Sequence, residues 1–233
     1  MPLVDVGDVK IYYEIRGSGE PLLLINGLGA QISEFTDLID LISAHRKVIA
    51  FDNRGAGKSD KPDVPYTIEM MAADTLGLLK ALNVGRTDVV GISLGGRIAM
   101  ELALAYPEFV SRLVLVSTSA KVVRSWQSRL VFGLIHNLPV VRGKQPRYAF
   151  IRQKNASDGF DCTDRLHEIT AKTLILAGRK DRFSPVALQE ELHSKIARSE
   201  FKAFDGGHLF FMMKERRNFL RTLESWLSEI PSS

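Results

Sequence analysis

The chain has 233 residues, a formal net charge of +4 and a hydrophobic content of 45%. These values predict one large α/β domain, or one domain with a small insert, with a sizeable buried core. The one cysteine, Cys162, excludes an internal disulfide; we expect it to pack in the interior of a protein from a reducing compartment.

The sequence contains neither a signal peptide pattern at its N-terminus nor a long apolar run. Residues 1–5 lack the basic stretch and the apolar core of a signal peptide. No apolar run approaches the roughly 18 residues of a membrane span. We therefore expect a soluble, cytoplasmic protein with no membrane span.

The positive charge is concentrated between residues 121 and 154. This basic segment contains no Asp or Glu and eight cations, without which the net charge of +4 becomes −4: Lys121, Arg124, Arg129, Arg142, Lys144, Arg147, Arg152 and Lys154. A nucleic-acid-binding protein spreads positive charge over a larger surface, so we expect no nucleic acid partner.

The predicted strands begin with a hairpin in which residues 3–6 pair with residues 9–15 across Gly7-Asp8. Continuous apolar runs are typical of parallel strands that are buried on both faces. Such runs occupy residues 21–25, 47–51, 87–90, 113–116 and 173–177, and residues 200–204 form the predicted last strand.

Helical patterns lie between these strands. Thr67 is the predicted N-cap of a helix over residues 68–82, and a second helix covers residues 94–105. Ser184 is the predicted cap and Pro185 the first residue of a helix that reaches residue 196. The last helix covers residues 215–227. Strands that alternate with helices predict an α/β fold with a mostly parallel central sheet, an opening antiparallel hairpin and helices on both faces.

The alternation stops between residues 117 and 172. Val122, Trp126, Leu130 and Leu134 recur at every fourth position and predict an amphipathic helix that ends before Pro139. We interpret residues 117–172 as a small helical insert, and residues 1–116 and 173–233 as the core.

The sequence Gly91-Ile92-Ser93-Leu94-Gly95 lies between a predicted strand and a predicted helix. A serine on such a sharp turn projects at the helix N-terminus, where free N–H groups stabilise negative charge. The small glycines allow neighbouring backbone to pass close by. Ser93 is therefore the candidate nucleophile.

A serine hydroxyl needs a base to remove its proton and a third group to orient that base. Of the five histidines, His208 alone follows the last strand on a turn, Asp205-Gly206-Gly207. The other four are interpreted as surface or helix-end residues: His45, His136, His167 and His193. Asp181 follows the strand at 173–177 and is the candidate acid, whereas Asp205 lies too near His208 in sequence.

An oxyanion hole needs two N–H donors that point at the developing negative charge. Leu94, the residue after the candidate nucleophile, supplies one. The second is expected from the loop after the first parallel strand, Asn26-Gly27-Leu28-Gly29, with Leu28 as the candidate donor.

These motifs resemble those of the α/β-hydrolase superfamily over essentially the whole chain. The order Ser93, Asp181, His208 is the order that this superfamily uses. Residues 51–59 match its Asp-x-Arg-Gly-x-Gly-x-Ser turn, in which we assign Asp52 and Arg54 a structural role. The superfamily usually has His-Gly where this chain has Asn26-Gly27; the mechanism stays intact because the donor there is a backbone N–H.

The resemblance implies that residues 117–172 form a short lid and that the protein is a serine hydrolase of the carboxylesterase type. The alternatives on the same triad are a lactonase, a thioesterase, a carbon–carbon bond hydrolase and a cofactor-free haloperoxidase. Another alternative is a slow-turnover small-molecule sensor that signals through a protein partner. The expected ligand is a small ester or lactone, with no metal and no cofactor. The basic segment is interpreted as a solvated lid surface or as a site for an anionic substrate or acidic carrier protein.

Overall fold

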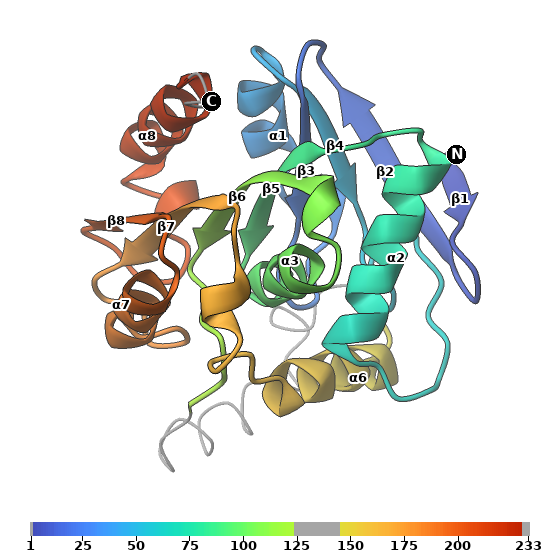
Figure 1. The fold of residues 1–233 in the computed structure, drawn as a ribbon. Helices are drawn as coiled ribbons and strands as arrows, with labels where there is room; N and C mark the ends of the chain where they lie inside the picture. The colour runs from blue at the N-terminus through green and yellow to red at the C-terminus, as the bar shows by residue number, and fades with distance from the viewer. Residues whose placement is uncertain (1, 124–144, 230–233) are drawn as a thin grey trace.

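The computed structural model describes residues 2–123 and 145–229. In these residues one sheet has the order β1-β2-β4-β3-β5-β6-β7-β8 (Figure 1). The strands are β1 Leu3–Asp5, β2 Lys10–Arg16, β3 Pro21–Ile25, β4 Lys47–Phe51, β5 Thr87–Ile92, β6 Val110–Val116, β7 Lys172–Gly178 and β8 Ser199–Phe204. β1 pairs with β2 and β2 with β4 in antiparallel register, and all other neighbours are parallel, as predicted.

Helices cover both faces of the sheet (Figure 1). One core cluster contains residues of α2, α3 and α7, and the other contains residues of α1 and α8. The helices are α1 Thr36–Ser43, α2 Ile68–Ala81, α3 Leu94–Ala105, α6 Arg147–Gly159, α7 Val186–Lys195 and α8 Arg216–Ser228; short 3-10 turns are η1 Ile32–Glu34, η2 Pro107–Phe109, η3 Leu166–Glu168 and η4 Phe210–Met212. The predicted α/β-hydrolase architecture is confirmed.

The central strands are buried on both faces because helices pack on each side. Leu22 and Leu24 of β3 belong to one core cluster, and Leu23 and Ile25 to the other. All four side chains have no exposed surface. A strand in this position needs apolar residues at every position, which is why continuous apolar runs located it.

Two helix starts test the predicted caps. The Thr67 side chain accepts a hydrogen bond from Met70 N, so Thr67 caps α2 as predicted. The prediction for α7 is wrong by one residue: the helix begins at Val186, and Pro185, with ψ 142°, is the N-cap. The backbone N–H of Ser184 donates instead to the carboxylate of Asp181, which holds the chain before the helix in a turn.

The described ends of the predicted insert contact the core. Arg97 of α3 donates to Ser157 Oγ of α6, which lies near α2 and α3 (Figure 1), and Lys121 and Asp161, both within the insert, form an isolated bridge. The amphipathic helix predicted around Trp126 lies outside the described residues. The extent of the lid therefore stays a prediction.

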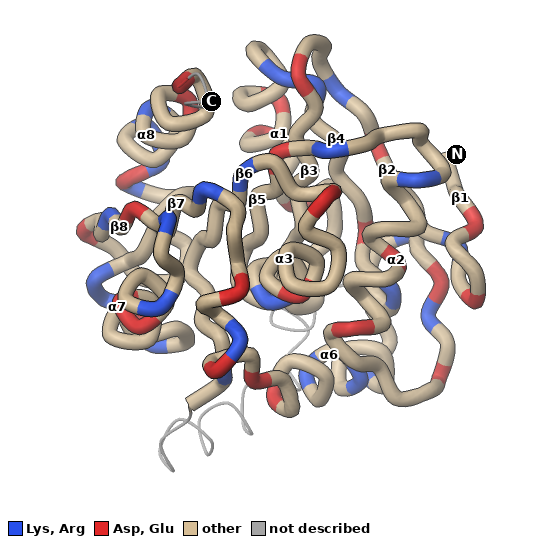
Figure 2. Tube along the Cα trace, in the orientation of Figure 1, with Lys and Arg blue, Asp and Glu red and all other residues tan. Residues whose placement is uncertain are grey.

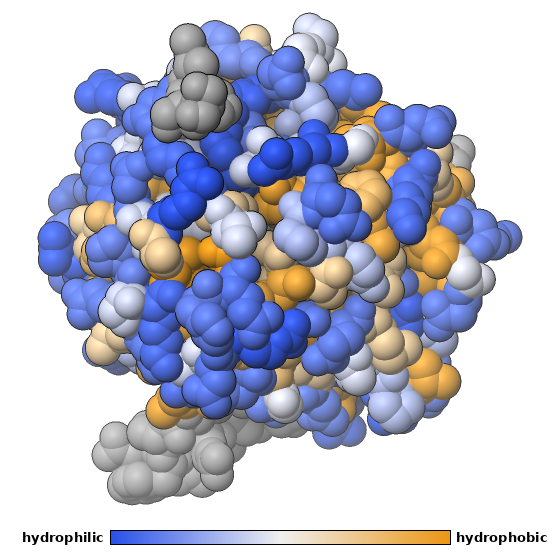
Figure 3. Space-filling view, viewed as in Figure 1, coloured by the Kyte–Doolittle hydropathy of each residue, from blue (hydrophilic) through white to orange (hydrophobic). Residues whose placement is uncertain are grey.

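Several cations of the basic segment are paired with acids. Lys121 Nζ lies 3.5 Å from Glu191 Oε1, and Arg152 Nη2 lies 3.0 Å from Asp63 Oδ1. Lys154 Nζ lies 2.7 Å from Asp158 Oδ2. Arg124, Arg129, Arg142 and Lys144 are not among the described residues. Charges of both signs are interspersed over the chain in Figure 2, and hydrophilic residues cover most of the face in Figure 3. These ion pairs favour the interpretation of the basic segment as a solvated surface. The binding of an acidic carrier protein stays an unsupported prediction.

Two further predictions concern the interior and the membrane. Cys162 is buried, with its thiol 3.9 Å from the carbonyl oxygen of Ala120, as expected of a packing residue. Over the described ranges, no helix has both the length and the apolar character that crossing a membrane requires.

Candidate active site

Ser93 lies on a sharp turn between β5 and α3. Its backbone, with φ 55° and ψ −114°, is in a strained region for a residue other than glycine. A Cβ on Gly91 would lie 2.5 Å from Gly95 O, and one on Gly95 would collide with Ile25 O. The two glycines thus permit the close packing of β3, β5 and α3 that holds the turn. Ser93 precedes the first turn of α3, where the helix dipole favours negative charge.

His208, in the turn after β8, connects the predicted nucleophile with the predicted acid. Its Nε2 lies 3.0 Å from Ser93 Oγ, and its Nδ1 lies 2.8 Å from Asp181 Oδ2. An ionised carboxylate only accepts hydrogen bonds, so the proton of a neutral imidazole belongs on Nδ1. This tautomer leaves the Nε2 lone pair directed at the Ser93 hydroxyl.

Asp181 is held by its own loop. Its side chain has no exposed surface, and Oδ1 accepts hydrogen bonds from Phe183 N at 2.8 Å and Ser184 N at 2.9 Å. The other oxygen is free to bond His208. A Cβ on Gly178 would lie 2.6 Å from Gly206 O, so a glycine at the end of β7 lets the acid loop approach the histidine loop.

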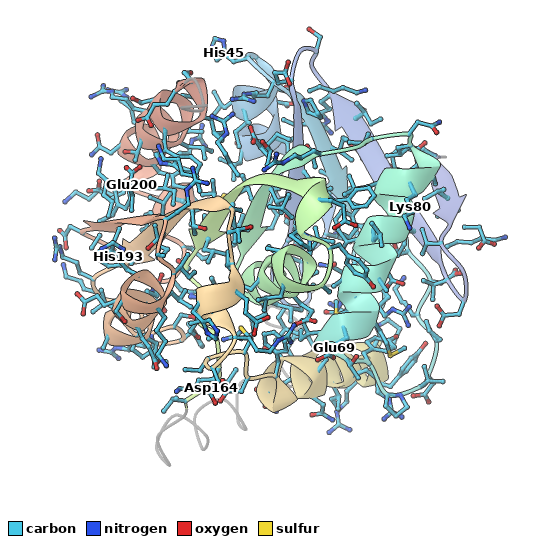
Figure 4. All side chains as sticks on the ribbon, in the orientation of Figure 1. His45, Glu69, Lys80, Asp164, His193 and Glu200 are labelled. Atoms are coloured by element: carbon cyan, nitrogen blue, oxygen red, sulfur yellow. The ribbon has the colours of Figure 1, made fainter. Side chains whose placement is uncertain are left out.

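The other candidate acid and bases lie apart from this arrangement. Asp205 is exposed and pairs with Lys180 at 2.6 Å, and this ammonium lowers the pKa of the Asp205 carboxyl. His45, His167 and His193 are exposed, and Figure 4 shows His45 and His193 at the periphery. His136 lies outside the described residues. In the described ranges, no group of three or more His, Cys, Asp or Glu side chains could hold a metal ion.

The loop of residues 26–29, which we call the oxyanion loop, lies beside Ser93. A Cβ on Gly27 would lie 3.4 Å from Ser93 Cβ. In the described part of the chain, neither Leu28 N nor Leu94 N donates a hydrogen bond, so both remain available to an oxyanion. Asn26, which replaces the usual histidine, is fully buried, and its side-chain amide makes no hydrogen bond to any described residue. Its main-chain carbonyl accepts one from Asn53 Nδ2 at 3.1 Å.

Two residues that sequence reasoning did not select hold the backbones of Ser93 and His208. Ser117 Oγ donates to His208 O, and Thr118 Oγ1 donates to Ser93 O, both at 2.7 Å. Both side chains are fully buried, and Ser117 has φ 49°. A polar Ser-Thr pair directly after a buried strand is the one signal that could have indicated this role.

The turn at residues 51–59 has the contacts of a structural element. Asp52 accepts hydrogen bonds from Ile32 N and Lys58 N, both at 2.8 Å, and burial raises the pKa of its carboxyl. Arg54 is buried and pairs with Asp74 on α2 and with Asp8. These contacts join the β4 turn to η1, to α2 and to the opening hairpin, which agrees with the structural role assigned to Asp52 and Arg54.

Known proteins show similarity over much or all of the chain. The RutD protein of Azorhizobium caulinodans, provisionally named a carbamate hydrolase, is 40% identical over 121 residues; the match covers 52% of this chain and 46% of that protein. This chain thus matches about half the length of that relative. A poly(3-hydroxyalkanoate) depolymerase of Ectopseudomonas oleovorans is 29% identical over 225 residues, or 83% of this chain and 80% of the relative.

A solved esterase of Exiguobacterium antarcticum superposes with a TM-score of 0.84 at 28% identity, over 95% of this chain and 96% of the esterase. Residues 20–152 match the family described as the alpha/beta hydrolase fold, which is more than half of the 233 residues. The chain therefore belongs to the α/β hydrolase family.

Proposed function

We propose that this protein hydrolyses carboxylic esters through an acyl-enzyme, with Ser93 as nucleophile, His208 as general base and Asp181 as its orienting acid. The observation that carries the proposal is the position of His208, whose two ring nitrogens lie 3.0 Å from Ser93 Oγ and 2.8 Å from Asp181 Oδ2. A base within hydrogen-bond reach of a serine, itself oriented by a buried carboxylate, is the arrangement that activates a hydroxyl.

The first half of the reaction forms the acyl-enzyme. Ser93 Oγ attacks the ester carbonyl carbon while His208 Nε2 takes the hydroxyl proton. The carbonyl oxygen becomes negatively charged, and the N–H groups of Leu28 and Leu94 donate hydrogen bonds to it. The tetrahedral intermediate then breaks its bond to the alcohol oxygen, which leaves with the proton that His208 returns.

The second half releases the acid. Water attacks the acyl carbon, and His208 takes a proton from that water. The intermediate breaks its bond to Ser93 Oγ, which regains a proton from His208. Asp181 stays ionised throughout and stabilises the imidazolium that forms in both halves. The similarity to the Exiguobacterium esterase supports an ester as the substrate class.

The test is hydrolysis of p-nitrophenyl esters from acetate to decanoate, with a lactone panel, by the wild type, Ser93→Ala and Ser194→Ala. Ser194 is an exposed serine on α7 and is the matched control. Ser93→Ala should lose about 10⁴-fold or more in kcat, because nucleophilic attack and base catalysis both pass through this hydroxyl. Ser194→Ala should keep the wild-type rate. Turnover by Ser93→Ala at the wild-type rate would refute the proposal.

The pH dependence of turnover tests the base. Only a neutral imidazole accepts the Ser93 proton, so kcat/KM should rise with pH across the range of about 5 to 8 in which histidines change charge. A flat profile over that range would count against His208.

Wild-type protein that binds esters or lactones with negligible turnover would instead favour the sensor alternative.

A further inference from the structure

Gln153, on α6, connects two loops that are distant in sequence. Its side chain has no exposed surface. Gly29 N donates to Oε1 at 3.0 Å, and Nε2 donates to Arg54 O at 2.7 Å. Reversing the amide would place its NH₂ group against an N–H donor and its oxygen against a carbonyl. The two partners therefore define a single orientation of the amide.

The first partner belongs to the oxyanion loop. The Gly29 N–H lies in the Leu28–Gly29 peptide, so its hydrogen bond to Gln153 fixes the peptide next to the one that carries the Leu28 N–H. Gly29 has φ 73°, and a Cβ there would lie 2.8 Å from Gln145 Nε2 and 3.2 Å from the Phe150 ring. The loop thus packs on Gln145 and α6 with no room for a side chain at position 29.

The second partner belongs to the turn that holds the opposite end of the same loop. Asn53 Nδ2 donates to Asn26 O, at the start of the oxyanion loop. Gln153 binds Gly29, at its end, and also the carbonyl of Arg54. Both ends of the oxyanion loop are therefore tied to residues 53–54. The Arg54 side chain anchors those residues through its buried ion pair with Asp74.

We propose that Gln153 is a positioning residue for the oxyanion hole: its amide holds the oxyanion loop so that the Leu28 N–H points at the developing charge. The proposal rests on the proposed ester hydrolysis, because the donor matters only when an oxyanion forms. Gln153 acts through the loop, so its effect belongs to the transition state and leaves the affinity for the substrate ground state unchanged.

The variant Gln153→Met keeps the length and approximate volume of the side chain and removes both hydrogen bonds. For p-nitrophenyl acetate, kcat should fall about 30-fold, less than the roughly 10²–10³-fold loss on removing a donor outright. KM should change less than about threefold. A boronic acid, which binds the serine as a tetrahedral adduct, should lose affinity by the same factor as kcat.

The matched control is Thr87→Val. Thr87 is buried, and its hydroxyl donates to Pro21 O at 2.9 Å, so this variant also removes a buried hydrogen bond between distant segments, at the opposite end of the strands. It should lower the melting temperature and leave kcat and boronic acid affinity at wild-type values. Equal losses of kcat in Thr87→Val and Gln153→Met would overturn the proposal, because both would then reflect general destabilisation.

A second variant covers the case in which Gln153→Met fails to fold. Gln153→Glu keeps an acceptor for Gly29 N and, with its carboxyl ionised, loses the donor to Arg54 O. Its kcat should fall about three- to tenfold, a smaller loss than the one expected of Gln153→Met. Folded Gln153 variants with wild-type kcat and boronic acid affinity would overturn the proposal.

The outcome for Gln153 is separate from the outcome for the proposed function. If the wild type turns over no ester and Ser93→Ala changes nothing, the proposed function fails. If the wild type is active through Ser93 and the Gln153 variants match it, the positioning role alone fails.

Discussion

The two ends of the parallel strands differ in how their polar groups are used. At the carboxyl end, Ser93 and Ser117 have positive φ angles, and the buried amide of Asn26 makes no hydrogen bond within residues 2–123 and 145–229. At the amino end, Asp88 accepts hydrogen bonds from Arg112 at 2.6 and 2.9 Å and from Arg46 at 3.0 Å.

The backbone is strained at the carboxyl end of the strands, whereas the charged side chains at the amino end are paired with one another. Positive φ angles and unpaired amides cost stability and persist where surrounding contacts hold them in place. Paired charges at the amino end fasten β5 and β6 and present no group that is positioned to attack a substrate. We therefore expect substitutions at the carboxyl end to change turnover and substitutions at the amino end to change stability.

The largest expected effect is on the proposed acid. Asp181→Asn should lower kcat by about 10⁴-fold, because an amide in that place favours the wrong imidazole tautomer. Steady-state kinetics with a p-nitrophenyl ester measures the loss. Asp205→Asn is the matched control and should stay within about threefold of wild type, because Asp205 pairs with Lys180 at the surface. A larger loss in Asp205→Asn than in Asp181→Asn would mean that the acid is assigned to the wrong residue.

The next effect concerns the two residues that hold the backbones of the proposed triad. Thr118→Val and Ser117→Ala remove the hydrogen bonds to Ser93 O and His208 O. Each should lower kcat about 10- to 100-fold, since small displacements of reacting groups have effects of this size.

Thr173→Val is the control for that pair. Its hydroxyl donates to Ala171 O at 2.9 Å, near the start of β7 and away from the site. The variant should keep wild-type kcat. Equal losses in all three variants would erase the distinction between the two ends of the sheet.

A complementary effect is expected at the amino end. Asp88→Asn removes the charge that faces Arg46 and Arg112, and all three side chains are largely buried. The variant should lose about 3 kcal/mol of unfolding free energy in urea titrations, while kcat/KM of the folded protein stays at the wild-type value. A substantial fall in kcat/KM with unchanged stability would contradict the assignment of this end to structure.

The smallest effect is expected at Cys162, which lies in the core. Burial raises the pKa of its thiol to about 12, so the thiol is protonated at pH 8 and lacks the reactive thiolate. Iodoacetamide at pH 8 should leave the native protein unlabelled and fully active, and should label it in urea. Rapid labelling of the native protein with loss of activity would place this thiol near the site.

Local patterns predicted much of the fold. The bounds of β3, β4 and α3 match the predicted ranges. The apolar pattern of each of these elements reflects which of its own faces are buried, so the pattern can be recognised in the local sequence. The N-cap of α7 is one residue later than predicted, and the Asp181 carboxylate that holds the turn before it lies outside the Ser184-Pro185 pattern.

Some residues of the candidate site could likewise be predicted from local sequence, and others could not. Ser93, Asp181 and His208 were predicted because each follows a strand at the carboxyl end of the sheet, where parallel strands bring their loops together. Residues that act through tertiary contacts were not predicted, since nothing near Gln153 in sequence indicates that it meets Gly29, 124 positions away. The same holds for Thr118, whose partner Ser93 is 25 positions away.

The most direct test of the central claim is covalent labelling with a p-nitrophenyl phosphonate, followed by peptide mass spectrometry. We predict one phosphonate per chain, on Ser93, and no labelling in Ser93→Ala. We also predict strongly reduced labelling in a His208→Ala variant, because the hydroxyl then lacks its base. Labelling of Ser117 or Ser119 in the wild type, or undiminished labelling of Ser93→Ala, would contradict the central claim.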